Sequence, residues 1–328
     1  MRTRSRHRSS PWPRHARTRR RSTGARDLRR RRLFKNQDLA EIAACIDWGP
    51  FFQTWDLAGP FPAILSDEVV GEAASKVYEE GQAMLKKIIE GRWLTANGAI
   101  ALLPANSVND DDIEIYTDES RKDVAFTWYG LRQQTEKQAI DGVMRPSRCL
   151  ADFVAPRDSG LADYVGMFAV TAGIGVEKKE KFFIDDLDDY SAIMLKALAD
   201  RLAEAFAEAL HHRVRTDLWG YAQDEALSNE AMIAEKYRGI RPAPGYPACP
   251  DHSVKGPMFE LLQCRDIGMT LTESLAMMPA ASVSGFYLSH PEATYFNVGK
   301  IGHDQLQDQA ARRHESEADL ERLLAPNL

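Results

Sequence analysis

The sequence predicts an α+β fold in a single domain. Helix-like and strand-like segments follow one another in mixed order along the 328 residues, and no internal repeat is present. Several strand candidates lie close enough together for hairpins, which favours antiparallel pairing over a doubly wound parallel sheet. The hydrophobic fraction of 44% is ordinary for a globular protein. No apolar run approaches the roughly 18 residues of a membrane span.

The first half of the chain predicts two helices and four strands. Residues 37–46 are typical of a short helix, and Ser66 can cap a second helix that runs to about Gly91. The apolar stripe expected on that second helix consists of Val69, Ala73, Val77, Met84 and Ile88. Strands are expected where short segments are apolar or alternate, at residues 99–103, 113–115, 124–128 and 164–171.

The second half predicts the longest helix, at about residues 189–215. Its expected inner face consists of Ile193, Leu198, Leu202, Ala205, Phe206, Ala209 and Leu210. Ser228 can cap a short helix that ends near Tyr237. Two further strands are expected, at residues 281–287 and 294–298. Two short helices should finish the chain, the last one capped by Ser316 with Asp319 three residues later.

The net charge of −6 conceals a basic tail and an acidic body. Of the 42 Lys and Arg, 14 are arginines within residues 1–32, which hold one acid, Asp27, and the remaining 28 bases face 47 acids. The tail has too few apolar side chains to form a core, so residues 1–32 are predicted to be disordered. Charge-driven nucleic-acid binding and organelle targeting are alternative interpretations. We favour a linker read out of frame, which would make the sequence a fragment of a longer gene.

Four cysteines, Cys45, Cys149, Cys249 and Cys264, are widely spaced and form no Cys-x-x-Cys pair. This spacing favours reduced thiols in a cytoplasmic protein over a disulfide framework. No apolar stretch of the kind found in secretory signals follows the basic start.

The most informative segment is Arg-Pro-Ala-Pro-Gly-Tyr-Pro-Ala-Cys-Pro-Asp-His, residues 241–252. Four prolines in ten residues exclude a helix or a central strand, because each fixes φ and removes a backbone donor. Gly245 is the position where the backbone can turn freely or approach a ligand. The Arg241 guanidinium can bind a carboxylate with two hydrogen bonds. A rigid segment with an Arg, a Gly and a Tyr therefore suits a small-molecule site.

This segment resembles the signature of the activation domain of cobalamin-dependent methionine synthase. In that family the S-adenosylmethionine site is built around Arg-x-x-x-Gly-Tyr, present here as Arg241, Gly245 and Tyr246. The resemblance runs from about Leu33 to the C-terminus and includes residues 47–52, 104–106, 131–137, 150–156, 196–206, 282–285 and 324–328. It implies an activation domain at residues 33–328, as a single curved domain around a bent antiparallel sheet with the ligand on its concave face.

The resemblance also implies further site residues. Asp47, in Asp-Trp-Gly-Pro-Phe-Phe, matches a ligand-contacting carboxylate, and physically a carboxylate is needed to offset the ligand's positive charge. Glu204 matches a position at the ligand, although a solvated helix acid is the alternative. Tyr295 matches a site tyrosine, and Phe296 stands where a second tyrosine is common. If position 296 acts through its backbone nothing is lost; if it acts through a hydroxyl, one contact is missing.

Other parts of the sequence do not indicate a zinc site, a dinucleotide site or an acyl-transfer site. Cys249-x-x-His252 looks like half a zinc site but has no second pair at metal spacing. Gly173-Ile174-Gly175 lacks the third glycine and the acidic ribose residue of a dinucleotide fingerprint. No Gly-x-Ser-x-Gly is present for acyl transfer.

The function implied by the resemblance is reactivation of methionine synthase. The module binds S-adenosylmethionine and donates its methyl group to reduced cobalamin, which another domain or chain holds, with an electron from flavodoxin or a flavin reductase. No base or nucleophile is needed from this chain, which therefore should not make methionine alone. A competing hypothesis is a non-catalytic module whose acidic surface docks an electron donor or a cobalamin protein. A nucleic-acid protein driven by the tail is a third and less favoured interpretation.

Overall fold

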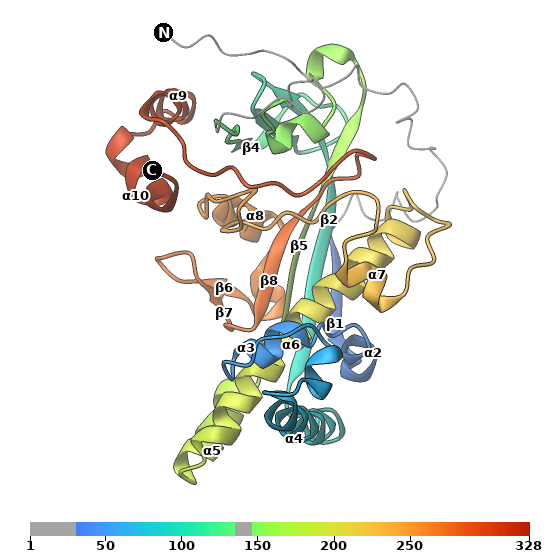
Figure 1. Cartoon of the computed structure of the whole chain (residues 1–328). Helices are drawn as coiled ribbons and strands as arrows, with labels where there is room; N and C mark the ends of the chain where they lie inside the picture. The colour runs from blue at the N-terminus through green and yellow to red at the C-terminus, as the bar shows by residue number, and fades with distance from the viewer. Residues whose placement is uncertain (1–30, 135–145) are drawn as a thin grey trace.

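The computed structural model describes residues 31–134 and 146–328; residues 1–30 and 135–145 lie outside the description. An open antiparallel sheet forms its centre, in the order β4-β3-β2-β5-β8, with β1 also paired to β2 (Figure 1). The strands are β1 (Arg32–Gln37), β2 (Thr95–Val108), β3 (Asp112–Tyr116), β4 (Val124–Tyr129), β5 (Asp163–Ile174) and β8 (Ser282–Tyr287). The predicted α+β class with an antiparallel sheet and surrounding helices is confirmed.

Strand β2 is the longest of the described strands at 14 residues, and the predicted strand 99–103 is its middle. One edge of β2 pairs with β5 from Thr95 to Ala105. The other edge pairs first with β1, as far as Ile100, and then with β3, starting at Ala105. Neither β1 nor β3 pairs with residues 101–104, and Pro104 lies in this interval, where a residue without a backbone N–H is tolerated.

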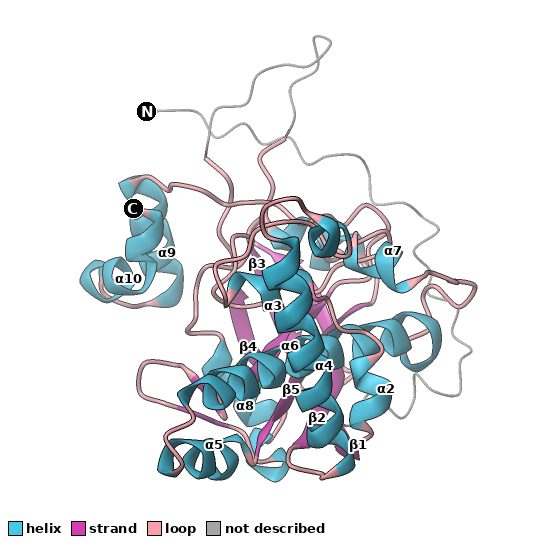
Figure 2. Ribbon diagram, turned by 60° about the horizontal axis from the view of Figure 1, so that its bottom comes forward, coloured by secondary structure: helices cyan, strands magenta, loops and turns pink. Residues whose placement is uncertain are grey.

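Both faces of the sheet are buried. Ile100 of β2 and Phe168 of β5 join a core under the helices, whereas Ala101 and Met167 join a second core on the opposite face. The period of two along each strand produces this division. Three helices whose side chains line the first core are α2 (Leu39–Ala43), α4 (Gly71–Glu90) and α6 (Asp189–Arg213), which Figure 2 shows in front of the strands.

The remaining elements surround this centre. They are α3 (Gly49–Gln53), α5 (Val176–Asp185), α7 (Asn229–Ile233), α8 (Lys255–Leu261), β6 (Thr270–Leu271), β7 (Met277–Met278), α9 (His303–Arg313) and α10 (Glu317–Leu324). The last two form a small cluster of their own with Leu131, Val298 and Ile301. They confirm the two predicted terminal helices, and Ser316 caps the second by accepting a hydrogen bond from the Asp319 N–H.

The predicted start of the second helix was wrong, and its predicted apolar stripe was wrong at Val69 and Ala73, whereas Ile88 is buried and Val77 and Met84 pack against the first core. Helix α4 begins at Gly71, because Asp67 accepts the N–H groups of Val69 and Val70 and so ends the preceding turn. Val69 is consequently 89% exposed. The face that α4 buries is formed by Gly71, Ala74, Gly81, Leu85 and Ile88. On α6, Ile193 is likewise exposed rather than on the inner face.

The predicted strand at residues 294–298 is irregular backbone instead. The Val298 N–H donates to the carbonyl of Pro247 at 2.9 Å, so the segment lies against the proline-rich segment. The edge of β8 that it could have joined is occupied by residues 240–242, as described below. The apolar side chains that suggested a strand at residues 294–298 are therefore explained by packing of this irregular segment against the proline-rich segment.

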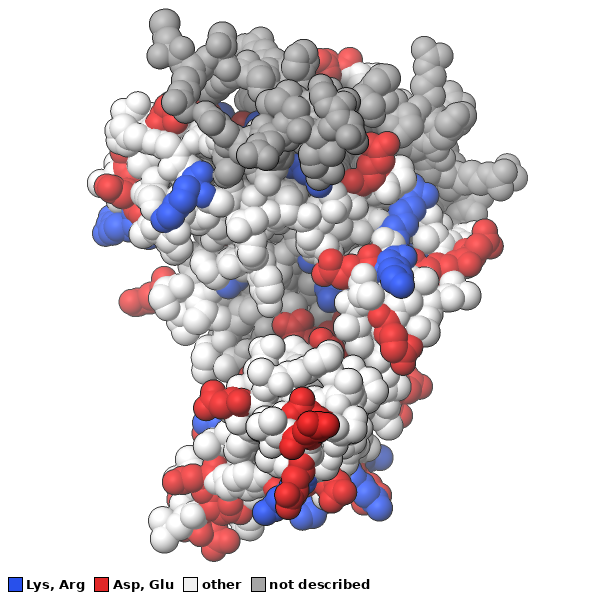
Figure 3. All heavy atoms as spheres, in the orientation of Figure 1, with Lys and Arg blue, Asp and Glu red and all other residues white. Residues whose placement is uncertain are grey.

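The N-terminal end of the fold includes two residues of the Arg-rich segment. Strand β1 starts at Arg32, and the Arg31 guanidinium lies 2.8 Å from the Asp266 carboxylate. Across residues 31–134 and 146–328, no helix is both long enough and apolar enough to span a membrane. Figure 3 shows acidic side chains spread over the face drawn there.

Candidate functional site

The proline-rich segment runs along the edge of β8 as an extra, irregular strand. Ile240 and Leu288 exchange two backbone hydrogen bonds of 3.0 and 3.1 Å, and the Phe286 N–H donates to the Pro242 carbonyl at 2.9 Å. Gly285 permits this approach, since a Cβ there would lie 2.6 Å from the Pro242 oxygen. The backbone on both sides of Arg241 is therefore fixed to the central sheet.

Gly245 closes a tight turn after that strand-like stretch. Its φ is +94°, and a Cβ would lie 2.2 Å from Cε1 of His252, so a side chain is excluded on two grounds. The Gly245 N–H donates to the Cys249 carbonyl at 2.8 Å, which holds the turn closed. The turn leaves the neighbouring Tyr246 56% exposed.

Helix α6 supplies the opposite wall of the site. Glu204, Glu208 and His211 are spaced i, i+4 and i+7, and so lie on one helix face. The Tyr246 hydroxyl lies 3.5 Å from the Glu204 carboxylate, and this charge is the largest cause that raises the pKa of Tyr246. The predicted residues Glu204, Arg241, Gly245 and Tyr246 are thus brought together.

The Arg241 guanidinium is held along one side only. Its Nη1 donates to Oε2 of Glu208 at 2.9 Å and lies 3.3 Å from Nδ1 of His211. Within the described residues no hydrogen bond reaches its Nε or Nη2. The Arg241 side chain retains 16% of its exposure. This leaves one fork of the guanidinium able to bind a carboxylate from solution.

Behind Arg241 lies a chain of buried charges. Glu208 lies 3.7 Å from Arg215, which is completely buried and pairs with Glu225 at 2.8 Å. Arg215 lies in a π-helical turn, Val214–Leu218, which continues α6 beyond its last regular residue. Acid and base alternate along this chain, from Glu225 through Arg215 and Glu208 to Arg241. The four charges of this chain, Arg241 included, consequently sum to zero.

His211 is neutral in this environment. Burial and the neighbouring Arg241 place its pKa well below the ordinary value. Because an arginine can only donate, Nδ1 of His211 must be the acceptor, and the proton resides on Nε2, which faces the Tyr221 hydroxyl at 3.4 Å. The ring stacks on Tyr287 with centroids 5.1 Å apart. The imidazole is therefore a fixed neutral acceptor for the arginine.

The two predicted residues 295 and 296 separate. The Tyr295 hydroxyl accepts the backbone N–H of Arg241 at 2.9 Å and also contacts the Tyr237 hydroxyl at 3.1 Å. Phe296 packs against Phe153 in the second core, with ring centroids 6.5 Å apart. Tyr295 thus anchors the arginine backbone, whereas the Phe296 ring is part of the apolar packing.

Asp47 lies in the connection between α2 and α3, two helices that pack against α6. Its Oδ1 accepts the Gly49 N–H at 2.9 Å. The charge of Glu208, after burial, raises the pKa of Cys45, which places this connection near the same end of α6. Asp47 thus lies two residues from a side chain close to Glu208, and within the described residues it makes no hydrogen bond or ion pair with Arg241.

Four residues of the site were not predicted: Glu208, His211, Tyr237 and Glu235. Glu235 has a φ of +55°, unusual for a residue with a side chain, and it feels the charges of Arg241 and Glu208. The helical spacing from Glu204 could have indicated Glu208 and His211. Nothing in the local sequence around Tyr237 or Glu235 indicates that they approach Arg241.

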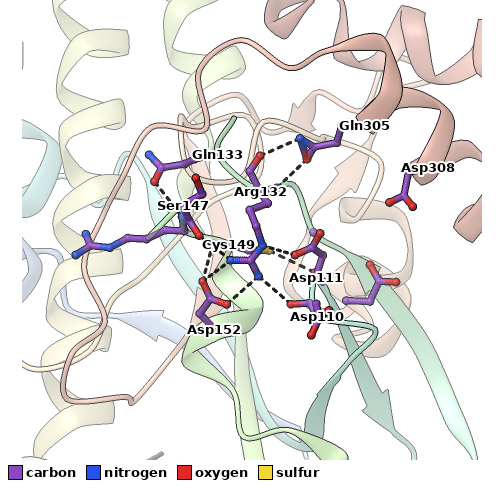
Figure 4. A network of polar contacts seen from close by, with 12 residues as sticks. Asp110, Asp111, Arg132, Gln133, Ser147, Cys149, Asp152, Gln305 and Asp308 are labelled. Carbon is purple, nitrogen blue, oxygen red and sulfur yellow. Dashed lines mark hydrogen bonds and ion pairs between the residues drawn. The ribbon is translucent and has the colours of Figure 1, made fainter. Parts of the chain in front are cut away.

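A second polar network, centred on Arg132, is structural (Figure 4). The guanidinium binds both oxygens of Asp152 at 2.8 and 2.9 Å and Oδ1 of Asp111 at 2.6 Å. The backbone of Arg132 exchanges two hydrogen bonds with the Gln305 amide of α9. Every donor of this arginine is used within the protein, so it joins the connection between β2 and β3, residues 147–152 and α9, and leaves no site for a ligand.

Metal and thiol chemistry find no support in the parts of the chain that the structure describes, where no three His, Cys, Asp or Glu gather as metal ligands. Cys249 is buried, and burial raises the pKa of its thiol well above the ordinary value. His252 is exposed and lies beneath the Gly245 turn. Cys249 and His252 are therefore part of the packing of the Gly245 turn.

Arg241, Glu204, Glu208 and Tyr246 gather between α6 and the extended segment, and the described residues beside them include no nucleophile–base pair. Such a group of charged and aromatic side chains is typical of a small-molecule binding domain. The chain belongs to the family described as "Vitamin B12 dependent methionine synthase, activation domain", which matches residues 38–314. It is also similar to the solved structure entitled "Crystal Structure of the MetH Reactivation Domain bound to AdoHcy", with 51% identity and a TM-score of 0.85. That match covers 91% of this chain and 90% of the other.

Proposed function

We propose that this chain binds S-adenosylmethionine between α6 and the proline-rich segment and presents its methyl group to reduced cobalamin held by another domain or chain. The observation that carries the proposal is the half-occupied Arg241 guanidinium, which turns one fork toward Glu208 and leaves the other for a carboxylate. The similar reactivation domain was solved with AdoHcy, which shares the adenosyl and amino-acid groups of this ligand.

The residues present suit the ligand's charges. Arg241 takes the α-carboxylate through Nε and Nη2, with two parallel hydrogen bonds. The carboxylates of Asp47 and Glu204 offset the ammonium group. Tyr246, with its exposed ring next to the Gly245 turn, covers the bound ligand, and backbone groups of the turn can pair with the adenosyl part.

The chemistry requires position more than reactivity. The sulfonium would supply an activated methyl group and leave as S-adenosylhomocysteine, and reduced cobalamin would supply the nucleophile. The residues of this chain orient the ligand so that the methyl group stays open to the approaching cobalt, which is catalysis by proximity. The first partner in this proposal is the cobalamin-binding domain of methionine synthase. The second is flavodoxin or a flavin reductase, which supplies the electron that reduces the cobalamin.

Calorimetric titration of the purified chain with S-adenosylmethionine tests the binding. We expect saturable binding at one site, and the absence of any binding heat or ligand-induced stabilisation would reject the proposal. The competing docking module, favoured only by the acidic surface, predicts association with an electron donor or cobalamin protein but no ligand binding. Mixing the chain with a reduced cobalamin domain and labelled S-adenosylmethionine then tests whether the methyl group is transferred.

A further inference from the structure

We infer that Glu208 and His211 are positioning residues that set the orientation of the Arg241 guanidinium, and so make the site selective for ligands that carry an α-carboxylate. This inference rests on the proposed function. Both residues contact the same nitrogen, Nη1, and neither reaches Nε or Nη2. Two acceptors on one nitrogen fix the plane of the guanidinium and direct its second fork away from α6.

The surroundings favour this role over a simple ion pair. Glu208 is 8% exposed and forms an ion pair with Arg215 at 3.7 Å, so burial leaves its carboxylate little room to move away from Arg241. His211 is completely buried against the Tyr287 ring and is fixed as a neutral acceptor. A partner that cannot move transmits its orientation to the arginine, as in the outer shell of other polar sites.

Charge balance supports the same conclusion. Glu225 compensates Arg215 at 2.8 Å, and Glu208 compensates Arg241 at 2.9 Å, so the site can stay formed before the ligand arrives. A ligand carboxylate then meets an arginine that is already oriented, which lowers the ordering cost of binding.

The experiment compares S-adenosylmethionine with decarboxylated S-adenosylmethionine, which keeps the adenosyl, sulfonium and ammonium groups and lacks only the carboxylate. The wild-type chain is titrated first, and failure to bind S-adenosylmethionine at all would reject the proposed function itself. The ratio that matters is the Kd of decarboxylated S-adenosylmethionine divided by the Kd of S-adenosylmethionine. In Glu208→Gln this ratio should fall about tenfold, because only the carboxylate contact depends on the arginine orientation. The decarboxylated ligand carries one more net positive charge, so loss of the Glu208 charge alone would weaken that ligand more, which is the opposite of the expected effect.

Two results would overturn the inference while leaving the proposed function intact. One is an unchanged ratio, which includes an equal loss for both ligands. The other is an increased ratio, which would mean that Glu208 merely competes for the arginine or acts on the ligands through its charge alone. Glu208→Asp keeps the charge between the two arginines but withdraws it by one methylene, and it should lower the ratio by less. If the glutamine variant does not fold, the aspartate variant decides; if neither folds, Glu208 is a structural residue and the inference is wrong.

Discussion

Replacing Arg241 by alanine should have two separate effects because the side chain faces two partners. Toward the ligand it loses the fork formed by Nε and Nη2, and toward the protein it loses the 2.9 Å contact with Glu208. Glu208 then remains buried with Arg215 at 3.7 Å as its nearest cation. The backbone of residue 241 should stay in place, since the Tyr295 hydroxyl binds its N–H and β8 holds its neighbours.

The magnitudes follow from these contacts. Loss of a charge-assisted hydrogen bond to the ligand should cost about 1.5–3 kcal/mol, or roughly ten- to a hundredfold in Kd. Breaking a fully buried ion pair costs about 3–5 kcal/mol. Here the residual partner Arg215 should reduce the loss in unfolding free energy to about 1–3 kcal/mol.

Calorimetry with S-adenosylmethionine gives the affinity, and urea unfolding without ligand gives the stability. Arg157→Ala is the matched control, because Arg157 is 61% exposed and pairs with Glu114 on another part of the surface. It should leave the affinity unchanged and change the stability by less than about 1 kcal/mol. Equal S-adenosylmethionine affinity in Arg241→Ala and wild type would refute the assignment of Arg241 to the ligand.

Three further variants test other parts of the site and fold. Asp47→Asn keeps an oxygen for the Gly49 N–H and removes only the charge, so it should weaken S-adenosylmethionine and S-adenosylhomocysteine alike if the carboxylate faces the ammonium; calorimetry showing two unchanged affinities would make it a loop residue only. Gly245→Ala should lower the unfolding free energy by more than about 1 kcal/mol, whereas Gly256→Ala, in open space on α8, should not lower it; equal urea midpoints would contradict the geometry. A chain starting at Arg31 should melt like the full chain, and one starting at Leu33 should lose less than about 1 kcal/mol; a drop of several degrees in the first would show that earlier residues contribute.

The sequence was sufficient for the parts of the site that depend on local backbone chemistry. Prolines and Gly245 restrict the chain wherever it lies, so the extended segment and its turn could be predicted without knowing their neighbours. The partners of Arg241 could not be predicted in the same way. Glu208 and His211 look like ordinary residues of a long helix, and only the approach of β8 and residues 240–242 gives them an arginine to bind.

The same distinction explains the errors in the fold. The strand expected at residues 294–298 has suitable side chains, but a strand also needs an open edge, and that edge is occupied. Strand β2 was predicted too short, because Asn97 and Pro104 interrupt its apolar pattern while its pairing with β5 continues past both. Helix α4 was placed too early, because Ser66 is a favoured cap in sequence, whereas the observed N-cap, Val70, makes no side-chain capping bond.

Strand β2 also determines how the domain can come apart. It is shared by β1 near one end, β3 near the other and β5 along nearly its whole length, so pulling either end of the sheet open strains the same backbone. The strands paired to β2 are therefore expected to separate together rather than one half at a time. The site is attached to β8, which pairs directly with β5. The backbone of Arg241, our proposed ligand contact, is therefore held in place by the whole sheet, even though it lies on a segment without regular secondary structure.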